Sequence, residues 1–261
     1  MRLSSVVLLF AMLFAAATAV AENPSKVTDA ELAAITARGV MLAGFDTAAW
    51  YATDAVLATH PTDGPVQCYV ARKADVGWIV AFGRLNESRD KFLNAFDAIQ
   101  NDTPDHFTVV IHETPKEETG FNLMAARAIE TARNDFRGEN RPYNVAVIPE
   151  TEGRLFVYLY PAQVKAGVYP LGGDVRYLIS PDGLTIIEKR QLHKTIIERT
   201  AKDIPAGAKE AAGYHTHVLS DLPEDTDVLF VLTRKPNMPE FVGAGKHVFK
   251  IDISGKISIV K

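Results

Sequence analysis

Residues 121–160 read FNLMAARAIETARNDFRGENRPYNVAVIPETEGRLFVYLY, and the spacing of the apolar residues changes within this stretch. Over 121–136 they recur every three or four positions, which predicts an amphipathic helix. Over 143–148 and 154–160, short runs of β-branched and aromatic residues predict strands. The change of period predicts an α+β fold, in which a helix-containing N-terminal half is followed by an antiparallel, β-rich C-terminal half.

The polar segment 137–142 separates these two patterns and marks a candidate domain boundary. It divides the chain into a mixed α/β region, 22–140, and a β-rich region, 141–261. The sequence leaves open whether the two regions form one continuous domain.

The N-terminal half is expected to begin with a helix, because Thr28 and Glu31 have the spacing of a capping box. Gly39 is expected to end this helix, and the apolar segment 40–57 is expected to be partly helical. The rest of the half is predicted as a hairpin of strands 66–72 and 78–85, a helix over 88–99 and a strand over 107–112.

The C-terminal half contains further strand-forming runs joined by turn residues. Two hairpins are predicted, over 175–189 around Ser180-Pro181-Asp182-Gly183 and over 247–260 around Ser254-Gly255. The apolar, β-branched run 228–233 is also predicted to be a strand.

Residues 1–21 have the features of a signal peptide. Arg2 is followed by an apolar run over 6–17, and Ala19 and Ala21 are the small residues that precede a cleavage site. The mature chain is therefore predicted to begin at Glu22 and to be exported, to the periplasm or beyond the cell. No segment after the signal peptide is expected to span a membrane.

Composition restricts the partners and the covalent structure of the chain. The sequence has 28 basic and 32 acidic residues and a formal net charge of −4, and the two signs are interspersed. Without a basic stripe, nucleic acid is not an expected partner, whereas a protein partner is compatible with this surface. Cys68 is the only cysteine in the sequence, so no intramolecular disulfide is expected.

One cluster of residues has metal-ligand spacing. In a strand, His215 and His217 would project from the same face, so both imidazoles could hold one cation. Asp227 follows and could add a carboxylate. Two neutral imidazoles and one carboxylate leave an open position on zinc, where a bound water is activated.

These residues resemble the JAMM metalloprotease motif, in which a His-x-His pair and a later Asp hold zinc while an upstream Glu activates the bound water. The resemblance implies that His215, His217 and Asp227 are zinc ligands. It also implies a general base at Glu152, or alternatively at Glu150.

The chain departs from the JAMM pattern at several positions. Val218 and Glu224 stand where the family usually has Pro and Ser, and the interval from the second His to the Asp is one residue shorter. The family's Asp lies in the first turn of a helix, whereas Asp227 precedes the run 228–233, which is predicted to be a strand. The alternative to a metal site is a pair of histidines that are hydrogen-bonded or solvated at a strand end, and His193 is interpreted as a polar strand residue.

The segments 158–161, 170–176, 180–183 and 248–251 resemble exported bacterial proteins of unassigned function, through turn and strand residues that carry no chemistry. The leading interpretation is therefore an exported globular protein with a binding or envelope-associated role. One alternative is a JAMM-like, zinc-dependent peptide or isopeptide hydrolase. A second is an interaction module that adds a strand to a partner, with the closing hairpin as its edge.

Overall fold

The computed structural model describes residues 27–59, 66–75, 77–199 and 210–260. The predicted signal peptide lies outside these residues. The helices of the described part are α1 (Asp29–Leu57), α2 (Phe121–Asp135) and α3 (Asp225–Thr233), and a short 3-10 turn covers Thr151–Gly153.

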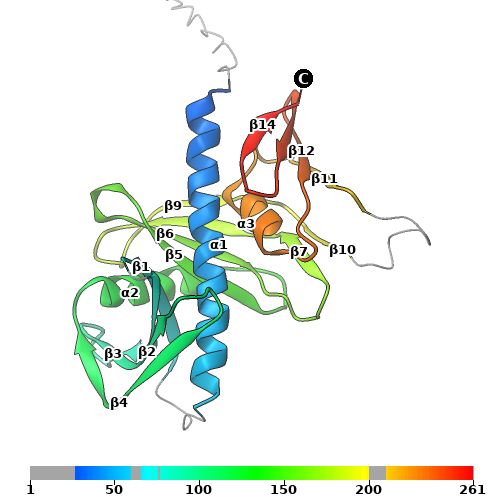
Figure 1. The fold of residues 1–261 in the computed structure, drawn as a ribbon. Coiled ribbons are helices and arrows are strands. Elements are labelled where there is room, and N and C mark those ends of the chain that lie inside the picture. Colours follow the sequence, from blue (N-terminus) through cyan, green and yellow to red (C-terminus); the bar gives the residue numbers. More distant parts are fainter. Residues whose placement is uncertain (1–26, 60–65, 76, 200–209, 261) are drawn as a thin grey trace, which may run out of the picture.

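The strands of the described part form three four-stranded sheets and one two-stranded pair (Figure 1). The first sheet is an antiparallel meander of β1 (Cys68–Ala74), β2 (Gly77–Leu85), β3 (Phe92–Gln100) and β4 (Phe107–Glu118). The second sheet has the order β5 (Tyr143–Pro149), β6 (Leu155–Pro161), β8 (Val175–Ile179) and β9 (Ile186–Gln191), also antiparallel. The pair joins β7 (Tyr169–Gly172) to β10 (Ile196–Arg199), and the third sheet has the order β11 (Gly213–Thr216), β12 (Glu240–Ala244), β13 (His247–Ile251) and β14 (Ile257–Ile259).

The long helix α1 runs through the middle of the molecule and joins its parts (Figure 1). Its C-terminal part, including Leu42, Phe45 and Ala52, packs in one core with the first two sheets. Its N-terminal part, with Leu32 and Ile35, packs in a second core with α3 and the third sheet. The α+β arrangement predicted from the sequence is therefore present, and α1 is the element that positions α3.

By length and composition alone, α1 could cross a membrane, contrary to the expectation that no segment after residue 21 does so. In the structure, however, Leu42, Phe45 and Ala48 are at most 1% exposed because sheet residues cover them. Other apolar residues of α1 stay exposed, among them Trp50 at 54% and Leu57 at 59%, so the protein covers only part of the surface of this helix.

The expectation that Gly39 ends the first helix is wrong, because α1 continues to Leu57. Gly39 does not end the helix. It allows α1 to pack closely against α3. A Cβ atom at Gly39 would lie 2.4 Å from Val228 Cβ and 2.7 Å from the Asp225 carbonyl oxygen, both on α3. The missing side chain therefore lets α1 and α3 touch through their backbones.

We expect Gly39→Ala to destabilise the protein by about 1–2 kcal/mol, because an overpacking cost of about 2–3 kcal/mol at α3 exceeds the roughly 1 kcal/mol gained in helix propensity. Gly120→Ala, at the N-cap of α2, is a control for space alone, since nothing lies within 4 Å of a Cβ atom at that position. Urea denaturation of both variants measures the difference. Equal unfolding midpoints for the two variants would show that the α1–α3 contact tolerates a methyl group.

Two other predicted elements are also wrong. Residues 88–99 were predicted to be helical, but Phe92–Gln100 is strand β3. The register of β3 shifts against both neighbours, near Asn94 and opposite Gly83, and such bulges interrupt the alternation that identifies a strand. The run 228–233, predicted to be a strand, belongs to helix α3. Val228, Leu229, Phe230 and Val231 are all buried, and an apolar run without a polar face has no period that separates helix from strand.

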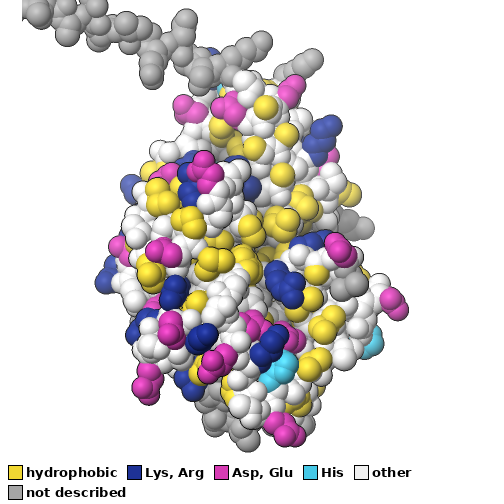
Figure 2. Space-filling model, turned by 90° about the vertical axis from the view of Figure 1, so that its left-hand side faces the viewer, with side chains coloured by type: hydrophobic (Ala, Val, Ile, Leu, Met, Phe, Trp, Pro, Cys, Tyr) yellow, Lys and Arg dark blue, Asp and Glu magenta, His cyan; other side chains and the backbone are white. Residues whose placement is uncertain are grey.

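The remaining predicted elements are confirmed. The capping box of Thr28 and Glu31 begins α1, and the strands 66–72, 78–85 and 107–112 correspond to β1, β2 and β4. Helix 121–136 corresponds to α2, and both C-terminal hairpins are present as β8–β9 and β13–β14. On the face drawn in Figure 2, basic and acidic side chains intermingle and neither sign gathers in one area.

Candidate metal centre

A β-α-β unit places three polar side chains next to one another. Strand β11 pairs in parallel with β12, and α3 forms part of the connection between them. His215 points inward from β11 because buried and exposed residues alternate along that strand. Asp227 comes from the first turn of α3 and Glu240 from the start of β12, and both are fully buried.

The register of β11 also fixes His217. It follows the strand two residues after His215, and its backbone N–H donates to the Gly243 carbonyl oxygen at 2.8 Å, which continues the pairing with β12. The two imidazoles therefore lie on the same side of the backbone. The side chains of His217 and Asp227 are 1% and 0% exposed.

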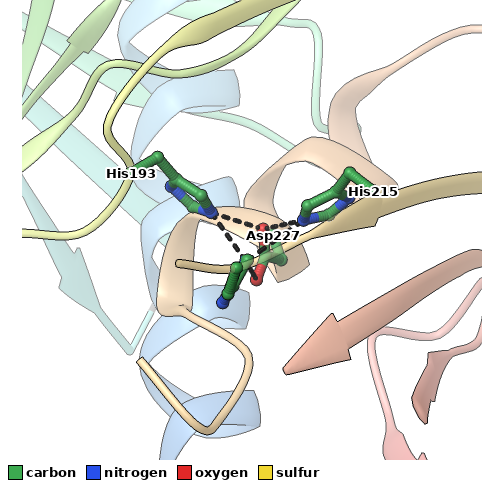
Figure 3. Close-up of side chains that lie close together, drawn as sticks. His193, His215 and Asp227 are labelled. Carbon is green, nitrogen blue, oxygen red and sulfur yellow. Dashed lines mark hydrogen bonds and ion pairs between the residues drawn. The ribbon is translucent and has the colours of Figure 1, made fainter. Parts of the chain in front are cut away.

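A third histidine reaches the cluster from the second sheet. His193 lies two residues past the end of β9, and its Nδ1 is 2.7 Å from Asp174 Oδ1. Its Nε2 is 3.0 Å from Asp227 Oδ1. Figure 3 shows His193 and His215 approaching Asp227 from opposite sides.

The ligand-type atoms of His193, His215, His217 and Asp227 all lie within 4.8 Å of one another. His217 Nε2 is 2.9 Å from His193 Nε2 and 3.2 Å from His215 Nε2. Asp227 Oδ1 is 3.1 Å from His215 Nε2, and Asp227 Oδ2 is 3.2 Å from His217 Nε2. Tetrahedral zinc with bonds of about 2.0–2.1 Å holds its ligand atoms about 3.3 Å apart, so the four side chains have nearly the spacing of a zinc site.

Each imidazole is held from behind by an acceptor. His193 Nδ1 faces Asp174, His215 Nδ1 is 2.9 Å from Glu240 Oε1, and His217 Nδ1 is 2.9 Å from the Leu222 carbonyl oxygen. Carboxylate and carbonyl oxygens only accept hydrogen bonds, so each Nδ1 carries the proton. In the neutral imidazoles, the three Nε2 lone pairs then point at one another. This arrangement repels itself unless a metal ion or a ring proton lies between the rings.

The buried charges of the cluster shift its pKa values strongly. Burial alone would lower the pKa of His215, but the carboxylates of Asp227 and Glu240 outweigh it and raise this pKa to about 9. Burial likewise opposes charge on His193, yet Asp174 and Asp227 raise its pKa well above the ordinary value. For Asp227, burial would raise the pKa, but His193 and the other two imidazoles hold it well below the usual range. Without metal, the cluster therefore retains protons between its rings and the carboxylate.

A cleft of about 520 Å³ opens beside the cluster, and the three histidines line it together with Leu171, Ile197 and Leu219 among others. Val218 and Tyr214, also in the lining, are 74% and 54% exposed. The lining contains Lys194 but no Asp or Glu from the described part of the chain. Among the described residues, the lining of this largely apolar cleft therefore offers no carboxylate that could act as a base.

Of the sequence-predicted site residues, the structure brings together His215, His217 and Asp227 but not Glu152. Glu152 lies in the turn between β5 and β6, next to the paired residues Leu155 and Ile179. His193 follows the opposite end of this sheet, where Val175 pairs with β9. The order of the strands therefore separates Glu152 from the cluster.

The same correction applies to Glu150, the alternative candidate for the base. Arg154 is 3.1 Å from Glu150 Oε2 and 3.5 Å from Glu152 Oε2, and the Glu152 side chain is 79% exposed. Both carboxylates are thus ion-paired at a surface turn, and neither has the buried, zinc-facing position of a general base.

Sequence reasoning missed His193 as a member of the cluster. It lies 24 positions before His217, in another sheet, so no local spacing connects them. The available signals were indirect: His193 lies two residues past the end of β9, and Asp174, its acceptor, lies between Gly172-Gly173 and the first residue of β8.

Comparison of the chain with protein-family models, with curated proteins and with solved structures finds no match. Interpretation of the cluster therefore depends on its own geometry and chemistry.

Proposed function

We propose that this chain is an exported zinc-binding protein, in which His193, His215, His217 and Asp227 hold the metal. The observation that carries the proposal is the convergence of the Nε2 atoms of the three histidines. The Nδ1 atom of each ring faces a hydrogen-bond acceptor, so Nε2 is the atom left to bind metal. Imidazole and carboxylate together are the ligands that zinc accepts in tetrahedral sites.

The surroundings of the four ligands support a built metal site. Histidine ligands usually donate their second N–H to a carboxylate or a backbone carbonyl, which fixes the ring and raises its basicity. Asp174, Glu240 and the Leu222 carbonyl occupy these positions here. Asp227 is oriented in a similar way, since the Glu224 backbone N–H donates to its Oδ2 at 2.7 Å.

The proposed role is binding or structural and does not include turnover. Four protein ligands fill the coordination sphere of tetrahedral zinc, whereas catalytic sites keep one position for water. The cleft beside the centre also lacks a carboxylate among its described lining residues. Its apolar walls suit a protein or peptide partner better than a small charged substrate.

Elemental analysis of the mature chain tests the proposal. We expect about one zinc per chain when residues 22–261 are purified without a histidine tag, and far less in a His215→Ala, His217→Ala double variant. His247→Ala is the matched control, because His247 lies on β13 next to Phe249, outside the cluster. Iron, copper and manganese are measured together with zinc, since the same ligands bind several divalent metals.

Two results would contradict the proposal. A metal-free chain that takes up no divalent metal after dialysis against zinc would exclude the site. Equal zinc in the double variant and in His247→Ala would place any bound metal elsewhere on the protein.

A JAMM-like hydrolase is the second candidate, favoured by one observation. Asp227 lies in the first turn of helix α3, after a His-x-His pair at the end of β11, as the resemblance implies for that family. Cleavage of an isopeptide-linked fluorogenic peptide by the zinc-loaded chain, with loss in Asp227→Asn, would support this candidate. Absence of cleavage by a chain with full zinc content would exclude it for that substrate class.

The strand-pairing module remains a prediction with less support. Its proposed edge, β14, has only three residues, and short edge strands are a common protection against further pairing.

A further inference from the structure

A second cavity, of about 260 Å³, lies outside the metal cluster. Residues of α1, β6, β7 and α3 line it, and none of the four proposed zinc ligands is among them. The volume lies just below the range typical of drug-sized ligands, so the cavity suits a single small ring. The proposed zinc site gives this cavity no role, and a ligand bound here would not depend on zinc.

Four residues on one face of α1 form a continuous part of the wall, namely Asp46, Thr47, Trp50 and Tyr51. Residues three or four positions apart on a helix are surface neighbours, with Cβ atoms about 5–6 Å from each other. Trp50 and Tyr51 are therefore the direct neighbours of Asp46 and Thr47 on the next turn. The two aromatic side chains are 54% and 38% exposed, so a ligand can reach them.

Two oxygens of this wall are available to a ligand. Asp46 Oδ1 accepts hydrogen bonds from Tyr160 Oη at 2.6 Å and from Asn144 Nδ2 at 3.3 Å, which fixes the carboxyl group. Asp46 Oδ2 and Thr47 Oγ1 have no hydrogen-bond partner among the described residues. The fully buried side-chain atoms without a partner belong to other residues, so these two oxygens are accessible.

The cavity has no excess charge that would select an ion. Burial raises the pKa of Asp46 above its ordinary value, although the hydrogen bonds to its carboxyl group oppose this effect. Asp174, the other acidic residue of the described lining, faces His193 with Oδ1, and its Oδ2 is enclosed. Lys235, the one basic residue of that lining, is exposed. The cavity therefore favours a neutral ligand.

A hydroxyl group is the partner that suits both accessible oxygens. It donates a hydrogen bond to a carboxylate and accepts one from a carboxylic acid, so it can pair with Asp46 in either protonation state. It can also exchange a hydrogen bond with the Thr47 hydroxyl in either direction. The aromatic neighbours add a second requirement, because their faces carry partial negative charge and pack against C–H groups.

We propose that this cavity binds a neutral sugar ring. A pyranose has C–H groups on its faces and hydroxyl groups around its rim. Its C–H face packs on Trp50, and two of its hydroxyl groups bond to Asp46 Oδ2 and Thr47 Oγ1. The adjacent polar oxygens distinguish this site from an apolar pocket, and the aromatic face distinguishes it from a hydrated surface hollow.

Calorimetric titration tests the ligand class. The probes are the methyl glycosides of glucose, galactose and N-acetylglucosamine, and cyclohexanol is a ring of the same size with a single hydroxyl group. We expect at least one glycoside to bind with a dissociation constant of about 1 mM. Cyclohexanol should bind at least about tenfold more weakly, because it leaves polar atoms of the wall without a partner.

Two variants of α1 test the assigned groups. Trp50→Ala removes the aromatic face, and Thr47→Val removes the hydroxyl group while keeping the shape. Each is expected to weaken binding of the best glycoside about three- to tenfold. Leu57→Ala and Thr53→Val are the matched controls, because both residues lie on the same helix but neither lines the cavity.

Tryptophan fluorescence provides a second readout. The sequence has two tryptophans, and Trp78 is only 7% exposed. A change in fluorescence on addition of the sugar that is absent in Trp50→Ala would place the sugar on Trp50. Because this side chain is more than half exposed, its replacement should leave the fold intact, which far-UV circular dichroism checks.

A disaccharide of the best-bound sugar distinguishes the source of the ring. Binding at least as tight as that of the methyl glycoside would indicate the end of a longer glycan, and loss of binding would indicate a free monosaccharide. The proposal is overturned if no glycoside binds or if cyclohexanol binds as well as the best glycoside. It is also overturned if folded Trp50→Ala and Thr47→Val bind the sugar like their controls.

Discussion

Zinc is expected to raise the unfolding temperature of a chain of residues 22–261 by about 8–16 °C. A ligand present at about 1,000 times its dissociation constant stabilises the folded state by about 4 kcal/mol, and each kcal/mol moves the midpoint of a protein of this size by about 2–4 °C. The cluster meets the condition for this linkage, because its ligands come from β11, α3 and the end of β9, which meet only in the folded chain. Differential scanning calorimetry with and without zinc measures the shift.

Replacement of single ligands should remove most of this shift. His193→Ala is the informative variant, because His193 is not part of the His-x-His and Asp motif. If that motif alone bound zinc, the His193→Ala variant would still bind it. If His193 is a ligand, the zinc-dependent shift should fall to a small fraction of the original, whereas His247→Ala should retain it. A full shift in His193→Ala would reduce the centre to the three residues of the His-x-His and Asp pattern.

The pH dependence of the metal-free protein follows from the raised pKa of His215. The pKa of His215 in the folded protein is about 9, above its ordinary value of 6.5, so the proton stabilises the folded state fully below pH 6.5. This contribution, roughly 3 kcal/mol for His215, is lost as the pH rises through 9. Because zinc displaces these protons, the zinc-dependent shift should grow between pH 6.5 and 9. A shift that stays constant over this range would mean that no ring proton is released on binding.

The sequence predicted the helix over 121–136 and most strands because their signals are local. Apolar spacing identified α2, and the turn Ser180-Pro181-Asp182-Gly183 identified the β8–β9 hairpin. The helix α3 was missed because its apolar face extends around the whole helix. Its local signal is the capping box of Glu224 and Asp227, in which both side chains bond backbone N–H groups. Two acidic residues three positions apart before an apolar run thus indicate the start of a helix. In this segment the helix cap outweighs the β-propensity of the apolar residues that follow.

The candidate site was predictable only in part, for a related reason. His215 and His217 share a strand face, which local spacing reveals, and Asp227 was proposed by resemblance. His193 and its acceptor Asp174 come from the second sheet, and only the packing of α1 against α3 and that sheet brings them close. Glu152 was chosen for its place in the sequence, yet strand order puts it at the other end of the sheet.

Asp225→Ala is expected to destabilise the protein by about 3–5 kcal/mol, the largest effect of any single substitution considered. Its carboxylate is fully buried and accepts from Arg38 Nε at 3.0 Å, Arg176 Nη1 at 2.7 Å and Tyr158 Oη at 2.8 Å. The alanine variant leaves two guanidinium groups and a phenol without this partner. These groups belong to α1 and to strands β8 and β6 of the second sheet. Loss of the Asp225 carboxylate therefore weakens the attachment of α3 to α1 and to that sheet.

Glu130→Ala provides the control for Asp225→Ala, because Glu130 forms a charge pair with Arg89 at the surface, with side chains 36% and 56% exposed. An exposed pair of this kind contributes less than about 1 kcal/mol. Urea denaturation in the absence of zinc should separate the two variants clearly, and equal losses would show that the buried network is no stronger than a surface pair. Because α3 begins at Asp225 and carries Asp227 in its first turn, Asp225→Ala should also weaken zinc binding, although Asp225 is not part of the cluster.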